Sequence, residues 1–148
     1  MIDTSNNTII TTNALLYKIK DGIIYFLLAQ ENDGNWGLPG GAKEVKDVNL
    51  LNTMKRELKE ELGLGPEDYI LKETGIKREF KYDHFQSNRF GKHGVVCFFL
   101  VHLENKSQLK ISTELKDVAW VTQNEALQKL TFDHIKDGFT ETSNLIYT

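Results

Sequence analysis

The sequence of 148 residues contains a single cysteine, Cys97, and only two prolines. One cysteine excludes an intramolecular disulfide and a zinc site built from several thiolates, and it favours a reducing compartment. No apolar run approaches the roughly 20 residues that a membrane-spanning helix needs, and the first residues lack the basic and then apolar order of a signal peptide. We therefore expect a cytoplasmic protein with no membrane partner.

An excess of charge of one sign is also lacking. The 18 Lys and Arg residues against 21 Asp and Glu residues give a formal net charge of −3, and the basic residues are scattered along the chain. A protein that coats a nucleic acid needs a basic surface, so a stable nucleic-acid complex is not expected. The hydrophobic fraction of 40% is ordinary for a globular protein, and the length suits a single domain over residues 1–148.

The apolar pattern predicts several strands around one central helix, with further helices near the end. Two apolar runs are separated by Lys20, Asp21 and Gly22, and Asp-Gly between such runs predicts a β-hairpin. The expected strands are 8–19, 23–30, 69–82, 95–101 and 117–121, and the expected helices are 47–62, 123–130 and 131–140. A Gly-rich and Asn-rich loop is expected at 31–41. This order predicts an α/β sandwich around a mixed central sheet.

The central predicted helix carries three glutamates on one face. Positions three and four apart share a side of a helix, so Glu57 lies beside both Glu60 and Glu61 although like charges repel there. A solvated acidic face is the ordinary explanation of such a run. The alternative is a site for a hard divalent cation such as Mg²⁺, which binds carboxylate oxygens. Gly40 and Gly41 upstream favour this alternative, because glycines let a backbone approach an ion or a phosphate closely.

Segment 56–64 reads Arg-Glu-Leu-Lys-Glu-Glu-Leu-Gly-Leu and, with Gly41, resembles the Nudix box. That box is the signature of metal-dependent hydrolases of nucleoside diphosphates linked to another group. Its second half matches without a gap, whereas the first half departs from the family pattern. Asp47 stands where the family has Glu, and eight residues rather than seven separate it from Arg56. The role of the loop acid therefore stays open between Asp47 and Glu44.

The resemblance covers nearly the whole chain, and it implies a Nudix-type α/β/α sandwich and a set of site residues. The expected metal ligands all bind through oxygen. They are the carbonyl of Gly40 and the carboxylates of Glu57, Glu60 and Glu61. Glu57 and Glu61 are the expected primary ligands of Mg²⁺ or Mn²⁺, and Glu60 is an additional ligand of a second ion. Arg56 is expected to orient the carboxylates through charge-assisted hydrogen bonds. The general base stays open between Glu57 and Glu114.

Within that family the chain is most similar to the asymmetric diadenosine tetraphosphate hydrolases. The similarity depends on the run Lys-Arg-Glu-Phe-Lys-Tyr at 77–82 and on Glu114, which precedes Trp120 by six residues. Those enzymes usually have Pro-Lys-Gly where this chain has Pro-Gly-Gly at 39–41. The resemblance implies that Tyr82 stacks on a base of the substrate. Lys81, Arg89 and Lys92 flank the expected mouth of the site and are candidates to hold phosphate oxygens, although scattered Lys and Arg residues are more often solvated surface residues.

The function implied is hydrolysis of a P–O–P bond in a nucleotide substrate. The resemblance favours cleavage of diadenosine tetraphosphate to ATP and AMP, with water attacking an outer phosphorus. Two alternatives stay open at the level of the sequence. One is hydrolysis of nucleoside triphosphates or other nucleoside diphosphate derivatives. The other is a Nudix-fold module that senses a nucleotide without catalysis, because a fold alone does not establish an activity.

Overall fold

The computed structural model describes residues 8–82 and 88–147. The strands are β1 (Thr8–Lys20), β2 (Ile23–Gln30), β3 (Trp36–Gly37), β4 (Gly40–Ala42), β5 (Tyr69–Lys81), β6 (His93–Leu103) and β7 (Asp117–Val121). The helices are α1 (Leu50–Leu62), α2 (Gln123–Lys129) and α3 (Asp133–Asn144), and short 3₁₀ turns lie at Pro66–Asp68 and Leu145–Tyr147. No helix of this described part is long and apolar enough to span a membrane.

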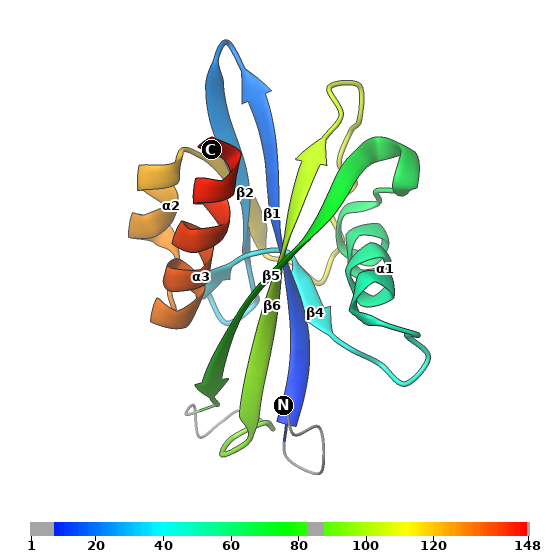
Figure 1. The fold of residues 1–148 in the computed structure, drawn as a ribbon, viewed down its shortest axis with the longest axis vertical. Coiled ribbons are helices and arrows are strands. Elements are labelled where there is room, and N and C mark those ends of the chain that lie inside the picture. The colour runs from blue at the N-terminus through cyan, green and yellow to red at the C-terminus, as the bar shows by residue number, and fades with distance from the viewer. Residues whose placement is uncertain (1–7, 83–87, 148) are drawn as a thin grey trace.

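The described strands form one mixed sheet with the order β3-β2-β1-β6-β5, in which β4 also pairs with β1 and β7 with β2. Strands β1 and β6 run parallel, and the other pairs are antiparallel. Helix α1 covers one face of the sheet, whereas α2 and α3 cover the other (Figure 1). The expected α/β/α sandwich with a mixed central sheet is confirmed.

Each face of the sheet has its own apolar core. On one face, Met54, Leu58 and Leu62 of α1 are fully buried at a spacing of four residues, which is the helical period expected from the sequence. On the other face, Phe139 of α3 packs against Phe26 of β2, with their ring centres 5.0 Å apart. The central strands β1 and β6 are buried on both sides, which explains why the sequence of β6 is almost entirely apolar.

The β1–β2 hairpin is confirmed, and both residues of its turn, Asp21 and Gly22, have the positive φ of a type I′ turn. Several boundaries differ from the expectation, among them those of β6, which covers His93–Leu103 rather than 95–101. Helix α1 begins at Leu50 rather than near 47, because Asn49 caps it by accepting a hydrogen bond from the Asn52 amide. The expected loop at 31–41 contains β3 and part of β4, and helix α3 continues to Asn144 instead of ending at 140.

Candidate active site

Strand β4 brings the glycine pair against α1, and both glycines are required by close contacts. Gly40 has a φ of 152°, and a Cβ there would collide with the carbonyl oxygen of Thr12 in β1. A Cβ at Gly41 would collide with the carboxylate of Glu57. The glycines therefore allow the backbone of β4 to approach β1 on one side and the glutamates of α1 on the other.

Glu61 is the most buried of the three box glutamates, with only 9% of the residue exposed. Its Oε1 accepts a hydrogen bond of 2.8 Å from the amide of Gly40, so the first glycine of β4 is held directly by this carboxylate. Burial raises the pKa of Glu61 to about 8 against the effect of that hydrogen bond, and the charges of Glu57, Glu31 and Glu114 raise it further. A buried carboxyl surrounded by other carboxyls is a site that favours a cation.

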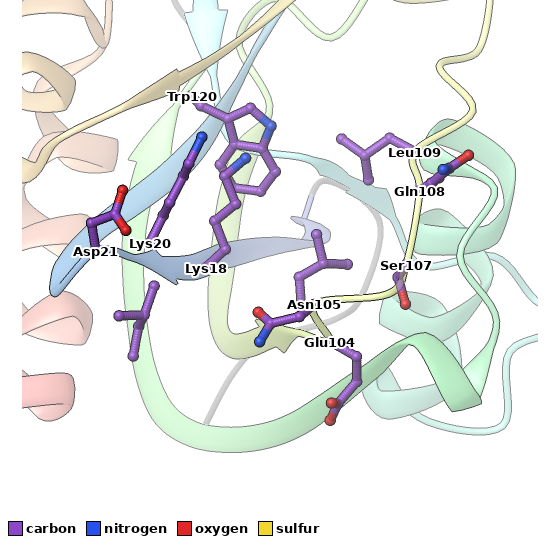
Figure 2. Close-up of a pocket in the computed structure, with 11 residues that line it drawn as sticks. Lys18, Lys20, Asp21, Glu104, Asn105, Ser107, Gln108, Leu109 and Trp120 are labelled. Carbon is purple, nitrogen blue, oxygen red and sulfur yellow. The ribbon is translucent and has the colours of Figure 1, made fainter.

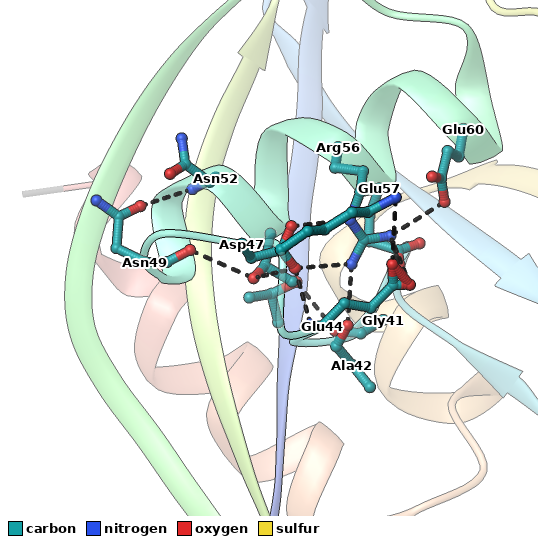
Figure 3. Close-up of polar contacts among 12 residues, drawn as sticks. Gly41, Ala42, Glu44, Asp47, Asn49, Asn52, Arg56, Glu57 and Glu60 are labelled. Atoms are coloured by element: carbon teal, nitrogen blue, oxygen red, sulfur yellow. Dashed lines mark hydrogen bonds and ion pairs between the residues drawn. The ribbon is translucent and has the colours of Figure 1, made fainter.

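Glu57 and Glu60 both interact with Arg56. Nη1 of Arg56 donates to Glu57 at 2.9 Å and to Glu60 at 3.1 Å, so the two carboxylates share one nitrogen (Figure 3). The side chain of Glu57 is 13% exposed, whereas that of Glu60 is 51% exposed. Burial raises the pKa of Glu57, and Arg56 opposes the shift. Within residues 8–82 and 88–147, no three Asp, Glu, His or Cys side chains converge as a preformed metal site.

Asp47 is the acid of the box loop that pairs closely with Arg56. The guanidinium binds it at two points, with Nε 3.1 Å from Oδ1 and Nη2 3.0 Å from Oδ2. The Asp47 carboxylate also accepts hydrogen bonds from the Thr53 hydroxyl and the Glu44 amide. The pKa of Asp47 lies well below its usual range, and the hydrogen bonds from the Arg56 guanidinium are the largest cause. Glu44 lies farther from Arg56, at 3.8 Å, and half of its side chain is exposed.

The structure therefore shows how a shorter acid in a longer loop reaches the arginine. Because α1 begins only at Leu50, Asp47 lies in the loop before the helix, where the Thr53 hydroxyl of the first helical turn reaches its carboxylate. Nη2 of Arg56 also donates to the Ala42 carbonyl at 3.0 Å, so the arginine ties β4 to this loop and to α1. Arg56 thereby holds together the three segments that carry the box.

Glu114 lies in the segment before β7, and its backbone carbonyl accepts a hydrogen bond from the Asn32 side chain. Its charge acts on the buried carboxyl of Glu61, so the structure brings Glu114 into the electrostatic surroundings of the box glutamates. Backbone bonds from Lys110 to Leu62 and from Ser112 to Glu61 hold the same segment against the end of α1.

Glu31 is a residue of this region that the sequence reasoning missed. Burial and the neighbouring Asp33 raise the pKa of Glu31, whereas Arg89 lowers it. Glu31 in turn is one of the charges that raise the pKa of Glu61. Its position directly after β2, at the start of the glycine-rich loop, is the only signal in the sequence that could have indicated it.

Tyr82 follows β5 and lies on the α3 side of the sheet, whereas α1 covers the opposite face. Its ring packs edge-on against Phe80, with ring centres 4.8 Å apart, and Phe80 stacks on His134 of α3 at 4.1 Å. The exposed Phe132 continues this aromatic group, because its ring centre lies 5.8 Å from that of His134. Lys81 is exposed, and the alternation along β5 directs it to the other face of the sheet.

Arg89 interacts with the ring and the hydroxyl of Tyr82. Its Nη1 donates to the Tyr82 hydroxyl at 3.1 Å, and its guanidinium carbon lies 5.5 Å from the centre of the Tyr82 ring. Its charge also acts on Glu31. The charge of Glu31 in turn acts on Glu61, so Arg89 and Glu31 connect the surroundings of Tyr82 electrostatically with those of the box glutamates.

Comparison with known proteins gives one family and one fold. Residues 9–142 match the model of the NUDIX domain. An Ap4A hydrolase from C. elegans, solved as a binary complex, superposes with a TM-score of 0.80 at 20% identity over 94% of this chain and 98% of that chain. The E. coli dihydroneopterin triphosphate pyrophosphohydrolase gives a TM-score of 0.77 at 18% identity over 89% and 92% of the two chains.

A third similar structure is the NUDIX domain of Shewanella oneidensis NrtR complexed with ADP ribose. It gives a TM-score of 0.71 at 23% identity over 97% of this chain and 94% of that chain. No curated protein matches the sequence. At these identities the similarity to solved structures concerns the fold, and the ligands of the three proteins differ from one another.

Proposed function

The chain belongs to the Nudix hydrolase family as a pyrophosphohydrolase, and on that premise we propose that Glu57 and Glu61 hold the divalent cation with which it cleaves a P–O–P bond of a nucleoside polyphosphate. The observation that carries this proposal is the contact of β4 with α1. The Gly40 amide binds Glu61, and the missing side chain of Gly41 leaves room for the Glu57 carboxylate. Two acidic side chains are thereby held at one backbone strand.

The donor set fits a hard cation. Nudix hydrolases generally use divalent metals, and the groups gathered here are carboxylate oxygens, which Mg²⁺ and Mn²⁺ prefer. Glu57 and Glu61 would be the main ligands, Glu60 an additional one, and the Gly40 carbonyl a backbone ligand. When bound, the cation supplies charge neutralisation and polarisation of the phosphoryl oxygens. Without it, the same carboxylates would repel a polyphosphate substrate.

The residues around the glutamates have separate tasks in this proposal. Arg56 holds Glu57 and Glu60 in place through its Nη1, and Asp47 fixes the guanidinium from the other side. Glu57 or Glu114 takes the proton from the water that attacks phosphorus, as the bond from phosphorus to the bridging oxygen breaks and the leaving phosphate departs. Lys81 on the exposed edge of β5 would hold phosphate oxygens.

For the substrate we propose a dinucleoside polyphosphate, with diadenosine tetraphosphate cut to ATP and AMP. Support comes from the aromatic group that ends at Tyr82, where a base could stack, and from Arg89, whose charge reaches both Tyr82 and Glu31. A base held at Tyr82 would place the phosphate chain along Arg89 toward the glutamates. Binding one end of the substrate at a fixed distance from the cation then selects which phosphorus is attacked.

A panel of substrates with and without Mg²⁺ tests both levels of this proposal. We expect Mg²⁺-dependent release of ATP and AMP from diadenosine tetraphosphate, faster than turnover of nucleoside triphosphates, nucleotide sugars or 5′-triphosphorylated RNA. In ¹⁸O-water the label should be found in only one of the two products. Two ADP molecules as product would contradict the asymmetric cut, and preference for a mononucleotide or a nucleotide sugar would contradict the dinucleotide substrate. Failure of the whole panel with Mg²⁺ and Mn²⁺ would contradict the proposal itself.

Tyr82→Ala tests the stacking role. We expect it to weaken binding of diadenosine tetraphosphate by about 1–3 kcal/mol, which appears mainly as a higher KM with a nearly unchanged kcat. Tyr82→Phe is the matched control, because it keeps the ring and loses only the hydroxyl that accepts from Arg89. Steady-state kinetics of both variants distinguishes the contribution of the aromatic ring from that of the hydroxyl. Equal KM values for Tyr82→Ala and the unmodified protein would show that the base binds elsewhere.

A further inference from the structure

A groove of about 780 Å³ lies at the hairpin end of the sheet (Figure 2). Three segments line it: the end of β1 with the hairpin turn, the segment that follows β6, and Trp120 of β7. Its volume falls within the range of small-molecule sites. None of its lining residues belongs to the box, to the aromatic group at Tyr82 or to the neighbours of Glu61.

The groove is well separated from the candidate active site. Thr12 of β1 pairs with Gly41 beside the glutamates, and Lys18 lies six residues farther along the same strand. At about 3.3 Å per residue this places the Lys18 end of the groove roughly 20 Å from the glycine pair, whereas Leu109 at the other end directly precedes Lys110, which bonds to the end of α1. A ligand bound at the Lys18 end of the groove would therefore occupy a site of its own, away from the glycine pair.

The β1 side of the groove carries two lysines. Lys18 and Lys20 are two residues apart on β1, so both side chains leave the same face of the strand. The Lys18 ammonium lies over the Trp120 ring, and in the view of Figure 2 the Lys20 side chain extends toward the same residue. Asp21 and Glu104 also line the groove, and Figure 2 shows both farther from Trp120. Neither lysine forms an ion pair with any carboxylate of residues 8–82 and 88–147. Two ammonium groups without an ion pair on the same face of one strand favour an anion, and lysine is a regular ligand of phosphate.

The rest of the wall suits a planar ring. Lys18 Nζ lies 4.2 Å from the ring centre of Trp120 and covers that face of the indole. Leu103 and Leu109 add apolar side chains to the lining, and the side-chain amide of Asn105 points into the groove. If Lys18 turns toward an anion, the indole face that it covers becomes free for stacking.

We propose that this groove binds a phosphorylated small molecule that carries a planar ring, as a nucleotide does. Lys18 and Lys20 bind the phosphate group, and the ring lies on Trp120 in the place that the Lys18 ammonium leaves. The two halves of the site depend on each other, because the movement of Lys18 that satisfies the phosphate also opens the aromatic surface. The site does not depend on the glutamates of α1 or on a cation.

The test is a titration of the metal-free, full-length protein with AMP, followed by the indole N–H resonance of Trp120 in ¹H–¹⁵N spectra. AMP contains no P–O–P bond, so the protein cannot consume it. Trp36→Phe assigns the two indole resonances. We expect a saturable shift of the Trp120 resonance, with AMP binding at least tenfold more tightly than inorganic phosphate or adenosine. The double variant Lys18→Gln/Lys20→Gln should weaken AMP binding at least tenfold, whereas the charge-matched Lys55→Gln/Lys72→Gln should not.

Tyr82→Ala and Glu57→Gln separate this site from the active site, because the Trp120 titration should be unchanged in both. The proposal is overturned if the Trp120 resonance does not shift, or if it shifts equally in Lys18→Gln/Lys20→Gln. It is also overturned if Tyr82→Ala or Glu57→Gln abolishes the shift, since AMP would then act from the active site. Equal affinity for AMP and inorganic phosphate would overturn the role of the ring.

Discussion

Replacing Glu61 by glutamine should lower kcat by roughly 100-fold or more, because it removes a charge that stabilises the transition state through the bound cation. Glutamine has nearly the same shape and keeps an oxygen that can accept the Gly40 amide, so the contact of β4 with α1 should persist. Glu57→Gln should act similarly, since Glu57 is the other box glutamate with a largely covered side chain, 13% exposed. Initial rates at saturating Mg²⁺ and substrate measure both effects.

Glu61→Gln should not destabilise the metal-free protein, and the stability of this variant should change less with pH than that of the unmodified protein. Burial raises the pKa of Glu61 to about 8 in the folded protein, well above its value in the unfolded chain. The folded state therefore holds this proton more tightly, so its stabilising effect is fully present below about pH 4.5 and is lost as the pH rises through about 8. Urea unfolding of the metal-free protein between about pH 5 and pH 9 should show this loss, and Glu61→Gln should reduce it.

Glu73→Gln is the matched control for this experiment, because Glu73 is an exposed glutamate of β5. It should leave both kcat and the pH dependence of stability unchanged. Wild-type turnover of Glu61→Gln at saturating Mg²⁺ would refute its role as a ligand. An unchanged pH dependence in Glu61→Gln would show instead that another group causes the loss of stability.

The parts of the site that lie close together in the sequence are the parts that the sequence predicts. Glu57 and Glu61 share a helical face because of the period of α1, and the structure confirms that helix and the buried stripe of Met54, Leu58 and Leu62. The hairpin is likewise a local consequence of Asp-Gly between two apolar runs. In such segments, period and turn chemistry alone determine the geometry.

The remaining features depend on contacts between distant segments. Strand β4 is only three residues long, and it forms because Thr11–Asn13 of β1 provide a partner some 30 positions earlier in the chain. Glu31 lies in the loop after β2, whereas Tyr82 and Arg89 lie after β5. No local sequence pattern indicates that the charges of these two loops act on each other. The partner of Arg56 was open between Asp47 and Glu44 for the same reason, since the answer depends on where α1 begins and on Thr53.

Arg56→Lys is the second substitution that we expect to lower kcat strongly. Arg56 donates five hydrogen bonds: two to Asp47 and one each to Glu57, Glu60 and the Ala42 carbonyl. Lysine keeps the charge but has three donors on one nitrogen, so it cannot bind all these groups at once. We expect kcat to fall by about 10–100-fold, as for other residues that orient metal ligands, and more Mg²⁺ to be needed for half-maximal rate.

The dependence on Mg²⁺ distinguishes orientation of the ligands from a general loss of structure. Glu57 and Glu60 are both bound by Nη1 of Arg56, so misplacing that nitrogen should alter how the carboxylates meet a cation. The effect on Mg²⁺ dependence should therefore appear under conditions in which urea unfolding shows the variant to be fully folded, where a merely destabilised protein would keep the Mg²⁺ dependence of the unmodified protein. Arg78→Lys is the matched control, because Arg78 also binds two carboxylates, Asp137 and Glu141 of α3, but both are more than half exposed. Exposed ion pairs contribute little, so this variant should keep its rate and its Mg²⁺ dependence. If Arg56→Lys also kept both, the cation would not depend on the arginine, and the carboxylates would be positioned by the contact between β4 and α1 alone.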